Sequence, residues 1–168
     1  IQSRVWLEGV GYATELRQAN STGTDIIRNK SFGAKTDTEI TISNLRINGN
    51  GDIVTSGSPN GINLYRVAKA KVTENYVHDF PHGFVGVPGY SRPIHLWETT
   101  NSIVSKNYLW NNSYSDIFLA VNANYNIITD NVIETEHRGI YTWQSRWITI
   151  TNNYVYGTGD KTNKEGIR

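Results

Sequence analysis

Side chains that transfer protons or bind acids are grouped in the middle of the sequence. His95 is suited to act as a general base, and the phenol of Tyr141 to share in proton transfer. Arg92 and Arg138 each supply a cation that can neutralise a carboxylate. β-Elimination needs both, because a base removes a proton beside a carboxylate that a cation holds. These four residues are therefore candidates for catalysis on an acidic sugar.

Carboxylates offer a second chemistry, the hydrolysis of a glycosidic bond. A glycosidase requires two carboxyl groups about 5 to 9.5 Å apart. Glu98 and Asp116 fail this test, because they fall on neighbouring predicted strands about five positions apart, or ~16 Å at the usual rise per residue. Asp116 with Glu136 remains a candidate pair, which makes Asp116 a further catalytic candidate.

The composition excludes several classes of protein and favours β structure. The 168 residues include 16 Lys and Arg against 15 Asp and Glu, and a net charge of +1 gives no electrostatic basis for binding nucleic acid. No apolar run approaches about 18 residues, which argues against a membrane span. The absence of Cys excludes disulfides and thiolate metal sites. Ile and Val together number 30, against 7 Leu and 7 Ala, a ratio typical of strands.

Two short motifs recur along the chain and predict its fold. The first, as in Val104-Ser105-Lys106-Asn107-Tyr108-Leu109, places an Asn between two strand-like segments. Its Asn recurs with spacings of 32, 24 and 22 residues as Asn75, Asn107, Asn131 and Asn153, and Leu45 takes its place in an earlier copy. The second motif begins at positions 61, 93, 116 and 139, each 14 or 15 residues before the next motif Asn. This near-constant phase indicates one repeating coil of about 22 to 24 residues with three short strands.

A coil of that length without a helical segment predicts a right-handed parallel β-helix of about five coils. Residues 1–168 are expected to form this single domain as a piece of a longer helix, because the pattern stops in mid-repeat. Equivalent positions stack about 4.8 Å apart, so the recurrent Asn side chains are expected to bond one another in an interior ladder. Asn also tolerates left-handed backbone angles, which suits a bend between strands.

Strand alternation predicts which residues face outward when Ile62, Leu64 and their equivalents face inward. One outward row holds Asn63, His95, Phe118 and Tyr141, and a second holds Tyr65, Trp97, Ala120 and Trp143. Five aromatic side chains on one face indicate a binding surface, since soluble proteins seldom expose such a patch otherwise. The predicted substrate-binding residues are Asn63, Tyr65, Trp97, Glu98, Phe118 and Trp143. The alternative is that another segment, a loop or a neighbouring subunit covers the face.

The coil between Asn75 and Asn107 is longer than those that follow it. Asn131 is 8 residues from Gly139, whereas Asn75 is 18 residues from Pro93. The additional segment, residues 82–92, is rich in Gly and Pro and leads directly into the aromatic face. We expect a loop beside that face, either as one wall of a groove or as a tolerated surface insertion.

Two segments resemble a known superfamily. Ile40-Thr41-Ile42-Ser43-Asn44-Leu45-Arg46-Ile47-Asn48-Gly49-Asn50-Gly51 resembles the TI-x-NL-x-I-x-GNG coil of pectate-lyase-like β-helix proteins, and residues 5–16 are similar to their early coil. The resemblance covers nearly the whole chain and implies a β-helix that binds polysaccharide along the aromatic sheet. The superfamily includes lyases, hydrolases, epimerases and phage tailspikes, and Arg92-Pro93 matches only a fragment of the RxPxxR pattern of pectate lyases.

These observations favour the binding and cleavage of an extracellular, uronate-containing polysaccharide by β-elimination, with glycoside hydrolysis as the second choice of reaction. The alternative is a non-catalytic module of a tailspike, adhesin or surface fibre, which would bind glycan or form a homotrimer through the same face. No cofactor is required for elimination, although uronate enzymes can recruit calcium through a few carboxylates. The expected location is outside the cell, on the cell surface or on a virion.

Overall fold

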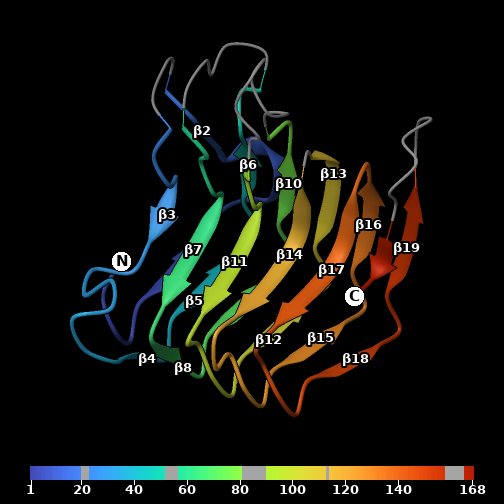
Figure 1. The fold of residues 1–168 in the computed structure, drawn as a ribbon. Helices are drawn as coiled ribbons and strands as arrows, with labels where there is room; N and C mark the ends of the chain where they lie inside the picture. Colours follow the sequence, from blue (N-terminus) through green and yellow to red (C-terminus); the bar gives the residue numbers. More distant parts are fainter. Residues whose placement is uncertain (20–22, 52–56, 81–89, 113, 158–164) are drawn as a thin grey trace.

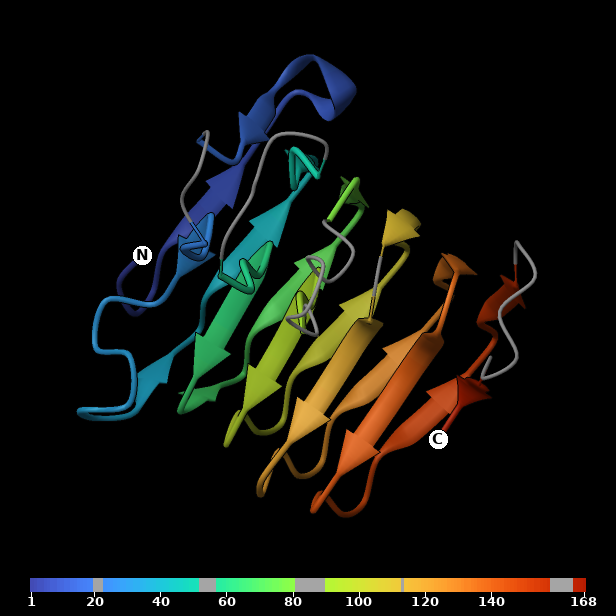
Figure 2. The same ribbon diagram turned by 45° about the horizontal axis from the view of Figure 1, so that its top comes forward.

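In the computed structural model the chain winds into a solenoid of short parallel strands (Figure 1). The structure describes residues 1–19, 23–51, 57–80, 90–112, 114–157 and 165–168. Three sheets of six strands each run along the solenoid, and Figure 2 shows the strands of successive turns lying side by side. The prediction of a parallel β-helix is confirmed.

The three sheets each receive one strand from every turn. Sheet A contains β1 (Trp6–Glu8), β5 (Thr41–Ser43), β9 (Lys71–Thr73), β12 (Ile103–Ser105), β15 (Ile127–Thr129) and β18 (Thr149–Thr151). Sheet B contains β2 (Glu15–Arg17), β6 (Arg46–Asn48), β10 (Tyr76–His78), β13 (Tyr108–Asn112), β16 (Val132–Thr135) and β19 (Tyr154–Gly157). Sheet C contains β3 (Ile27–Arg28), β7 (Ile62–Tyr65), β11 (Ile94–Trp97), β14 (Ser115–Ala120), β17 (Arg138–Trp143) and β20 (Glu165–Ile167). A small pair, β4 (Asp37–Thr38) with β8 (Val67–Ala68), and a 3-10 turn, η1 (Gly11–Ala13), complete the described elements.

The described strands make six turns, one more than the motif copies predicted. The additional turn is the first, β1 to β3, which contains no copy of the Asn motif. The lengths of the turns follow the spacings of the motif in the sequence. Leu45 and Asn75 are bonded across 30 residues, and the next three ladder steps span 32, 24 and 22. The last two ladder steps span 22 to 24 residues, and the earlier turns are longer because they contain longer connections between sheets B and C.

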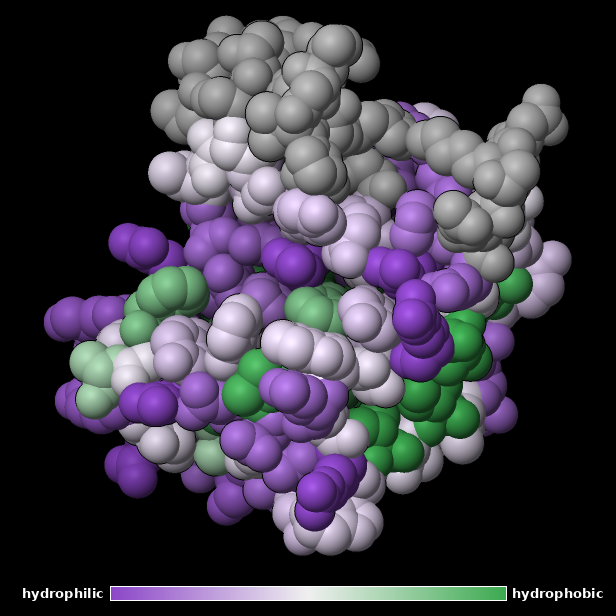
Figure 3. All heavy atoms as spheres, viewed as in Figure 1, coloured by the Kyte–Doolittle hydropathy of each residue, from purple (hydrophilic) through white to green (hydrophobic). Residues whose placement is uncertain are grey.

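Aliphatic side chains from all three sheets fill the solenoid. The predicted core residues are buried without exception: Leu64, Leu96, Leu119, Ile94, Ile117 and Ile140. Each fully buried side chain of this size contributes roughly 1.5–3 kcal/mol of hydrophobic stabilisation. In the last turn Ile148, Ile150 and Val155 are only partly buried, and Figure 3 shows strongly hydrophobic atoms gathered over that turn.

The predicted Asn ladder is present between sheets A and B. Asn75 Nδ2 donates to Asn107 Oδ1 at 3.0 Å, Asn107 to Asn131 at 3.0 Å, and Asn131 to Asn153 at 2.8 Å. Each Asn oxygen also accepts from the backbone N–H of the preceding ladder residue, and Leu45 N–H donates to Asn75 in this way. The ladder thus satisfies buried backbone groups at a corner where strand pairing is interrupted.

The left-handed backbone at this corner does not lie at the ladder residues themselves, as the sequence had suggested. It lies one position earlier, with φ between 55° and 58°, at Asn44, Glu74, Lys106, Asp130 and Asn152. Three of these five residues are not Asn, so tolerance of this conformation does not explain the motif. The ladder Asn is required for its side-chain amide, which has both a donor and an acceptor.

Candidate functional site

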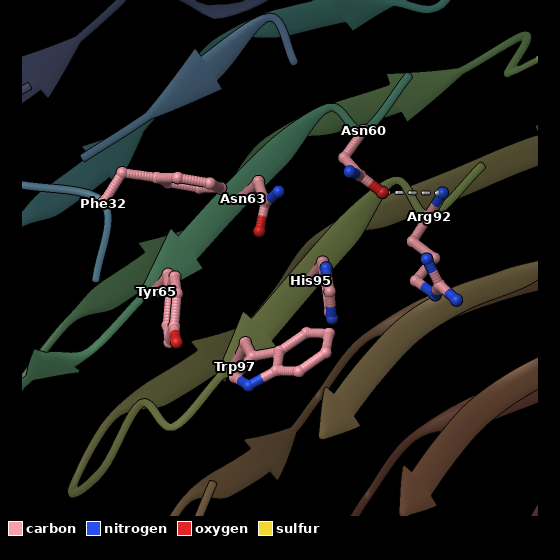
Figure 4. A pocket seen from close by; sticks show the side chains of 7 residues that line it. All are labelled: Phe32, Asn60, Asn63, Tyr65, Arg92, His95 and Trp97. Atoms are coloured by element: carbon pink, nitrogen blue, oxygen red, sulfur yellow. Dashed lines mark hydrogen bonds between the residues drawn. The ribbon is translucent and has the colours of Figure 1, made fainter. Parts of the chain in front are cut away.

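The outward face of sheet C contains a cavity of about 240 Å³ on β7 and β11 (Figure 4). Its lining residues are Phe32, Asn60, Asn63, Tyr65, Arg92, His95 and Trp97. Parallel pairing of β7 with β11 places His95 beside Asn63 and Trp97 beside Tyr65. A concave site with aromatic walls and a few converging polar groups is typical of ligand binding.

His95 is a buried polar residue in this lining. Only 4% of it is exposed, and within the described part of the chain neither ring nitrogen has a hydrogen-bond partner. Its ring stacks on Phe118 with 5.2 Å between centroids and meets Trp97 edge-on at 5.7 Å. Desolvation, followed by the positive charge of Arg92, lowers the pKa of His95 from 6.5 to about 3. His95 is therefore a neutral imidazole at neutral pH, with two nitrogens that a ligand can bond.

Arg92 brings a positive charge to the same cavity. Its guanidinium lies 4.7 Å from the ring centroid of Phe118 and 5.6 Å from that of Tyr114, and its Nε is buried without a partner. Among the described residues no carboxylate pairs with it. Burial lowers the pKa of Arg92, but the group stays charged because the ordinary pKa of a guanidinium is far above neutrality. An unpaired, partly desolvated guanidinium is suited to bind a carboxylate.

The walls of the cavity are aromatic on one side and amide-bearing on the other. Tyr65 lies between Phe32, at 5.6 Å, and Trp97, at 5.9 Å. Asn60 Oδ1 accepts the backbone N–H of Arg92 at 3.2 Å, the contact drawn in Figure 4. The apolar rings offer a flat surface to a sugar, and the amides offer bonds to its hydroxyl groups.

A second group of aromatic and basic side chains lies further along sheet C. Arg138 lies over Tyr141 at 4.9 Å and over Tyr114 at 5.1 Å, and its Nε donates to Glu165 at 2.8 Å. Glu165 also bonds Arg168 at 3.1 Å. Glu165 neutralises the charge of Arg138. Of the two arginines predicted to be catalytic, only Arg92 therefore has no carboxylate partner among the described residues.

The structure separates two residues that the sequence paired for catalysis. The ring of Phe118 stacks on His95 on one side and on Tyr141, at 4.9 Å, on the other. His95 and Tyr141 are therefore two strands apart and do not meet at one substrate bond. Tyr65, which the sequence assigned to binding, supplies the phenol that shares the cavity with His95.

The predicted outward rows are present, but half of their members are not exposed. Asn63, His95, Phe118 and Ala120 are buried, because neighbouring side chains of the same face pack over them. Tyr65, Trp97 and Tyr141 are half-buried, and Trp143 is 44% exposed. Ala120 interrupts the second aromatic row, since it pairs with Trp97 on one side and Trp143 on the other. The expectation of a continuous exposed patch is wrong, and a local cavity takes its place.

Asp116, a catalytic candidate from the sequence, lies inside the solenoid and not on the outward face of sheet C. Asp116 is 1% exposed, and Asn112 Nδ2 donates to its carboxyl group at 2.8 Å. The equivalent position is Gly139 in the next turn and Gly61 two turns earlier, where a Cβ would meet the core side chains Val155 and Phe80, respectively. This position therefore points into the solenoid, because β14 begins at a corner where two successive residues face inward. Asp116 and Glu136 interact electrostatically, and their proposed catalytic pairing stays a prediction.

The remaining predicted residues have structural partners or lie outside the described chain. Glu98 pairs with Arg66 at 2.7 Å rather than lining the cavity. Of the predicted insertion at 82–92, residues 82–89 lie outside the described residues, while Arg92 at its end lines the cavity. Phe32 and Asn60 were missed, because they come from connections between strands that the repeat pattern does not cover.

The described residues contain neither a cluster of metal ligands nor a helix that could span a membrane. No group of three or more His, Asp or Glu side chains converges there, so calcium binding stays a prediction. In the same part of the chain, no helix has the length and apolar character needed to cross a membrane.

The stacked parallel turns define a right-handed β-helix with a cavity on one sheet. Comparison with known families agrees: residues 10–167 match the family described as right handed beta helix region, and the chain belongs to it. Such domains are found in polysaccharide-acting enzymes and in structural or binding modules. Neither a curated protein nor a solved structure matches the chain significantly.

Proposed function

We propose that this chain binds an acidic polysaccharide along sheet C and cleaves it by β-elimination. The observation that carries the proposal is that two polar groups without partners among the described residues share the cavity. One is the buried imidazole of His95, and the other is the cation of Arg92. A buried polar group without a partner costs about 1–3 kcal/mol. A ligand that bonds these groups removes that cost, which is a reason for such groups to persist in a cavity.

One uronate residue fits this set of side chains. Its carboxylate pairs with the guanidinium of Arg92, and its ring lies against Trp97 and Tyr65. A bound carboxylate also offsets the charge by which Arg92 lowers the pKa of His95. Binding of substrate therefore offsets the smaller of the two causes that lower the pKa of His95, while desolvation remains.

The elimination assigns a role to each polar group. His95 removes the proton from the carbon next to the carboxylate, while Arg92 stabilises the negative charge that develops on that carboxylate. The electrons of the broken C–H bond form a carbon–carbon double bond as the neighbouring C–O bond to the next sugar breaks. The departing oxygen takes a proton from the hydroxyl of Tyr65. The products are one chain with an unsaturated uronate at its end and one with a new hydroxyl group.

A specific observation favours a second candidate, a non-catalytic glycan-binding module. A pKa of about 3 makes the ligand-free imidazole of His95 a weak base. In this case the same cavity recognises the glycan, as in a tailspike or surface fibre, and no bond is broken.

A panel of polygalacturonate, alginate and hyaluronate tests both candidates. Binding is measured by calorimetry, and elimination by the ultraviolet absorbance of unsaturated uronate. Replacing Trp97 by Ala should weaken binding at least tenfold, because an aromatic contact with a ligand is commonly a hot spot. Trp147→Ala is the matched control, since Trp147 is 61% exposed and does not line the cavity.

The outcomes separate the candidates. Elimination is supported if a polymer binds and produces the absorbance of unsaturated uronate, and if His95→Ala abolishes that absorbance. If a polymer binds but no absorbance develops, the chain is a non-catalytic binding module. If no polymer binds, and Trp97→Ala lowers the melting temperature sharply, the face is a structural contact and the glycan proposal is wrong.

A further inference from the structure

Asp25, just before β3, is bonded to both amides of the cavity. Asn60 Nδ2 donates to Asp25 Oδ1 at 2.7 Å, and Asn63 Nδ2 donates to Asp25 Oδ2 at 2.9 Å. One carboxylate of the preceding turn therefore holds two side chains of the next. Asp25 itself does not line the cavity.

These bonds fix which end of each amide is free. The orientation of Asn60 is set twice, because its oxygen accepts the N–H of Arg92 while its nitrogen donates to Asp25. The nitrogen of Asn63 is likewise engaged by Asp25. Among the described residues none donates to Asn63 Oδ1, and Figure 4 shows this oxygen on the side of Tyr65 and His95. Asn63 thus presents an acceptor, and not a donor, to the cavity.

We propose that Asp25 is a positioning residue that makes this cavity select a sugar with a free hydroxyl group at Asn63. The inference rests on the proposed binding of an acidic polysaccharide. A free hydroxyl can donate to Asn63 Oδ1, whereas an O-acetylated one cannot. Without Asp25 the amide can rotate and offer its NH₂ group, so discrimination between the two forms is lost.

The negative charge of Asp25 allows two explanations of its role to be distinguished by the direction of the change in affinity. If Asp25 acted only through its charge, its removal would strengthen the binding of a polyanion, because a repulsive charge would be lost. If Asp25 positions the amides, its removal weakens the binding of the unmodified polymer. The two explanations therefore predict opposite changes for Asp25→Ala.

The probe is the tightest-binding polymer of the panel, in unmodified and chemically O-acetylated forms. We expect Asp25→Ala to bind the unmodified form roughly tenfold more weakly, the effect of about one hydrogen bond, and to bind the acetylated form nearly unchanged. Asp25→Asn keeps one acceptor oxygen and should restore part of the selectivity. Asp130→Ala, which removes an exposed carboxylate next to β15 on sheet A, is the matched charge control and should change neither affinity.

Asn63→Ala removes the acceptor directly and tests the same step if Asp25→Ala does not fold. Its loss of selectivity should equal that of Asp25→Ala, and the double variant should add nothing further. The inference is overturned if the wild type binds but Asp25→Ala binds as tightly or more tightly, or if the wild type prefers neither form. Failure of the wild type to bind any polymer overturns the proposed function, and this inference with it.

Discussion

The burial of His95 couples its protonation to folding. The folded state keeps the imidazole neutral down to about pH 3, whereas the unfolded chain takes up the proton near pH 6.5. Below pH 6.5 the unfolded state therefore binds more protons, and the contribution of His95 to stability is lost as the pH falls from 6.5 toward 3. The slope is at most ~1.4 kcal/mol per pH unit for one proton.

Chemical denaturation at pH 7 and pH 4.5 measures this effect in the wild type and in His95→Phe. The Phe ring can retain the stack on Phe118 but has no titrating group. The variant should lose less stability between the two pH values than the wild type does. Equal losses would show that His95 does not stay neutral in the folded protein.

The protonation of Asp116 makes stability depend on pH in the opposite direction to that of His95. Burial raises its pKa to about 8, against the effect of its hydrogen bonds with Asn112 and Thr135. The folded state holds the proton while the unfolded chain releases it near pH 3.8, so stability falls as the pH rises from about 4 to 8. Asp116→Asn, which cannot ionise, should have a flatter stability profile than the wild type between pH 6.5 and 8. A wild-type profile that is no steeper than that of the variant would contradict a protonated Asp116.

At the scale of elements, the Asn ladder holds sheets A and B together at their shared corner. Asn107→Leu removes the bonds from Asn107 Nδ2 to Val72 O and to Asn131, and leaves the N–H of Asn75 without its acceptor. We expect a loss of ~1–3 kcal/mol in the free energy of unfolding. Asn153→Leu, in the partly exposed last turn, should cost less because water can replace its bonds. Equal costs at the two sites would indicate that burial does not set the value of a ladder bond.

At the scale of the whole molecule, stability should be greatest in the middle turns of the solenoid. Each turn contacts only its neighbours, and the outer strands are less well covered: Trp6 of β1 and Tyr154 of β19 are 67% and 65% exposed. Amide hydrogen exchange should be roughly a hundredfold slower in β11 and β14 than in β1 and β19. A single uniform rate would mean that the solenoid opens only as one cooperative unit.

The sequence by itself determined the repeating coil, the inward residues of sheet C and the Asn ladder. These features are periodic, and parallel stacking turns a period in sequence into a column in space. Leu45 illustrates how far this extends, since even the degenerate motif copy occupies the ladder position and bonds to Asn75.

Only the tertiary structure decided how the site is built, because its geometry depends on neighbours that the period does not specify. The rings of Phe118 and Trp97 pack against His95, and Arg92 lies near enough to affect its pKa. Strand alternation predicts on which face of the sheet a side chain lies, but not whether its neighbours bury it. Asp116 turns inward because the chain bends at a corner, where alternation no longer holds. Asp25 bonds the two amides of the cavity from the preceding turn, and it lies in a connection that carries no repeat.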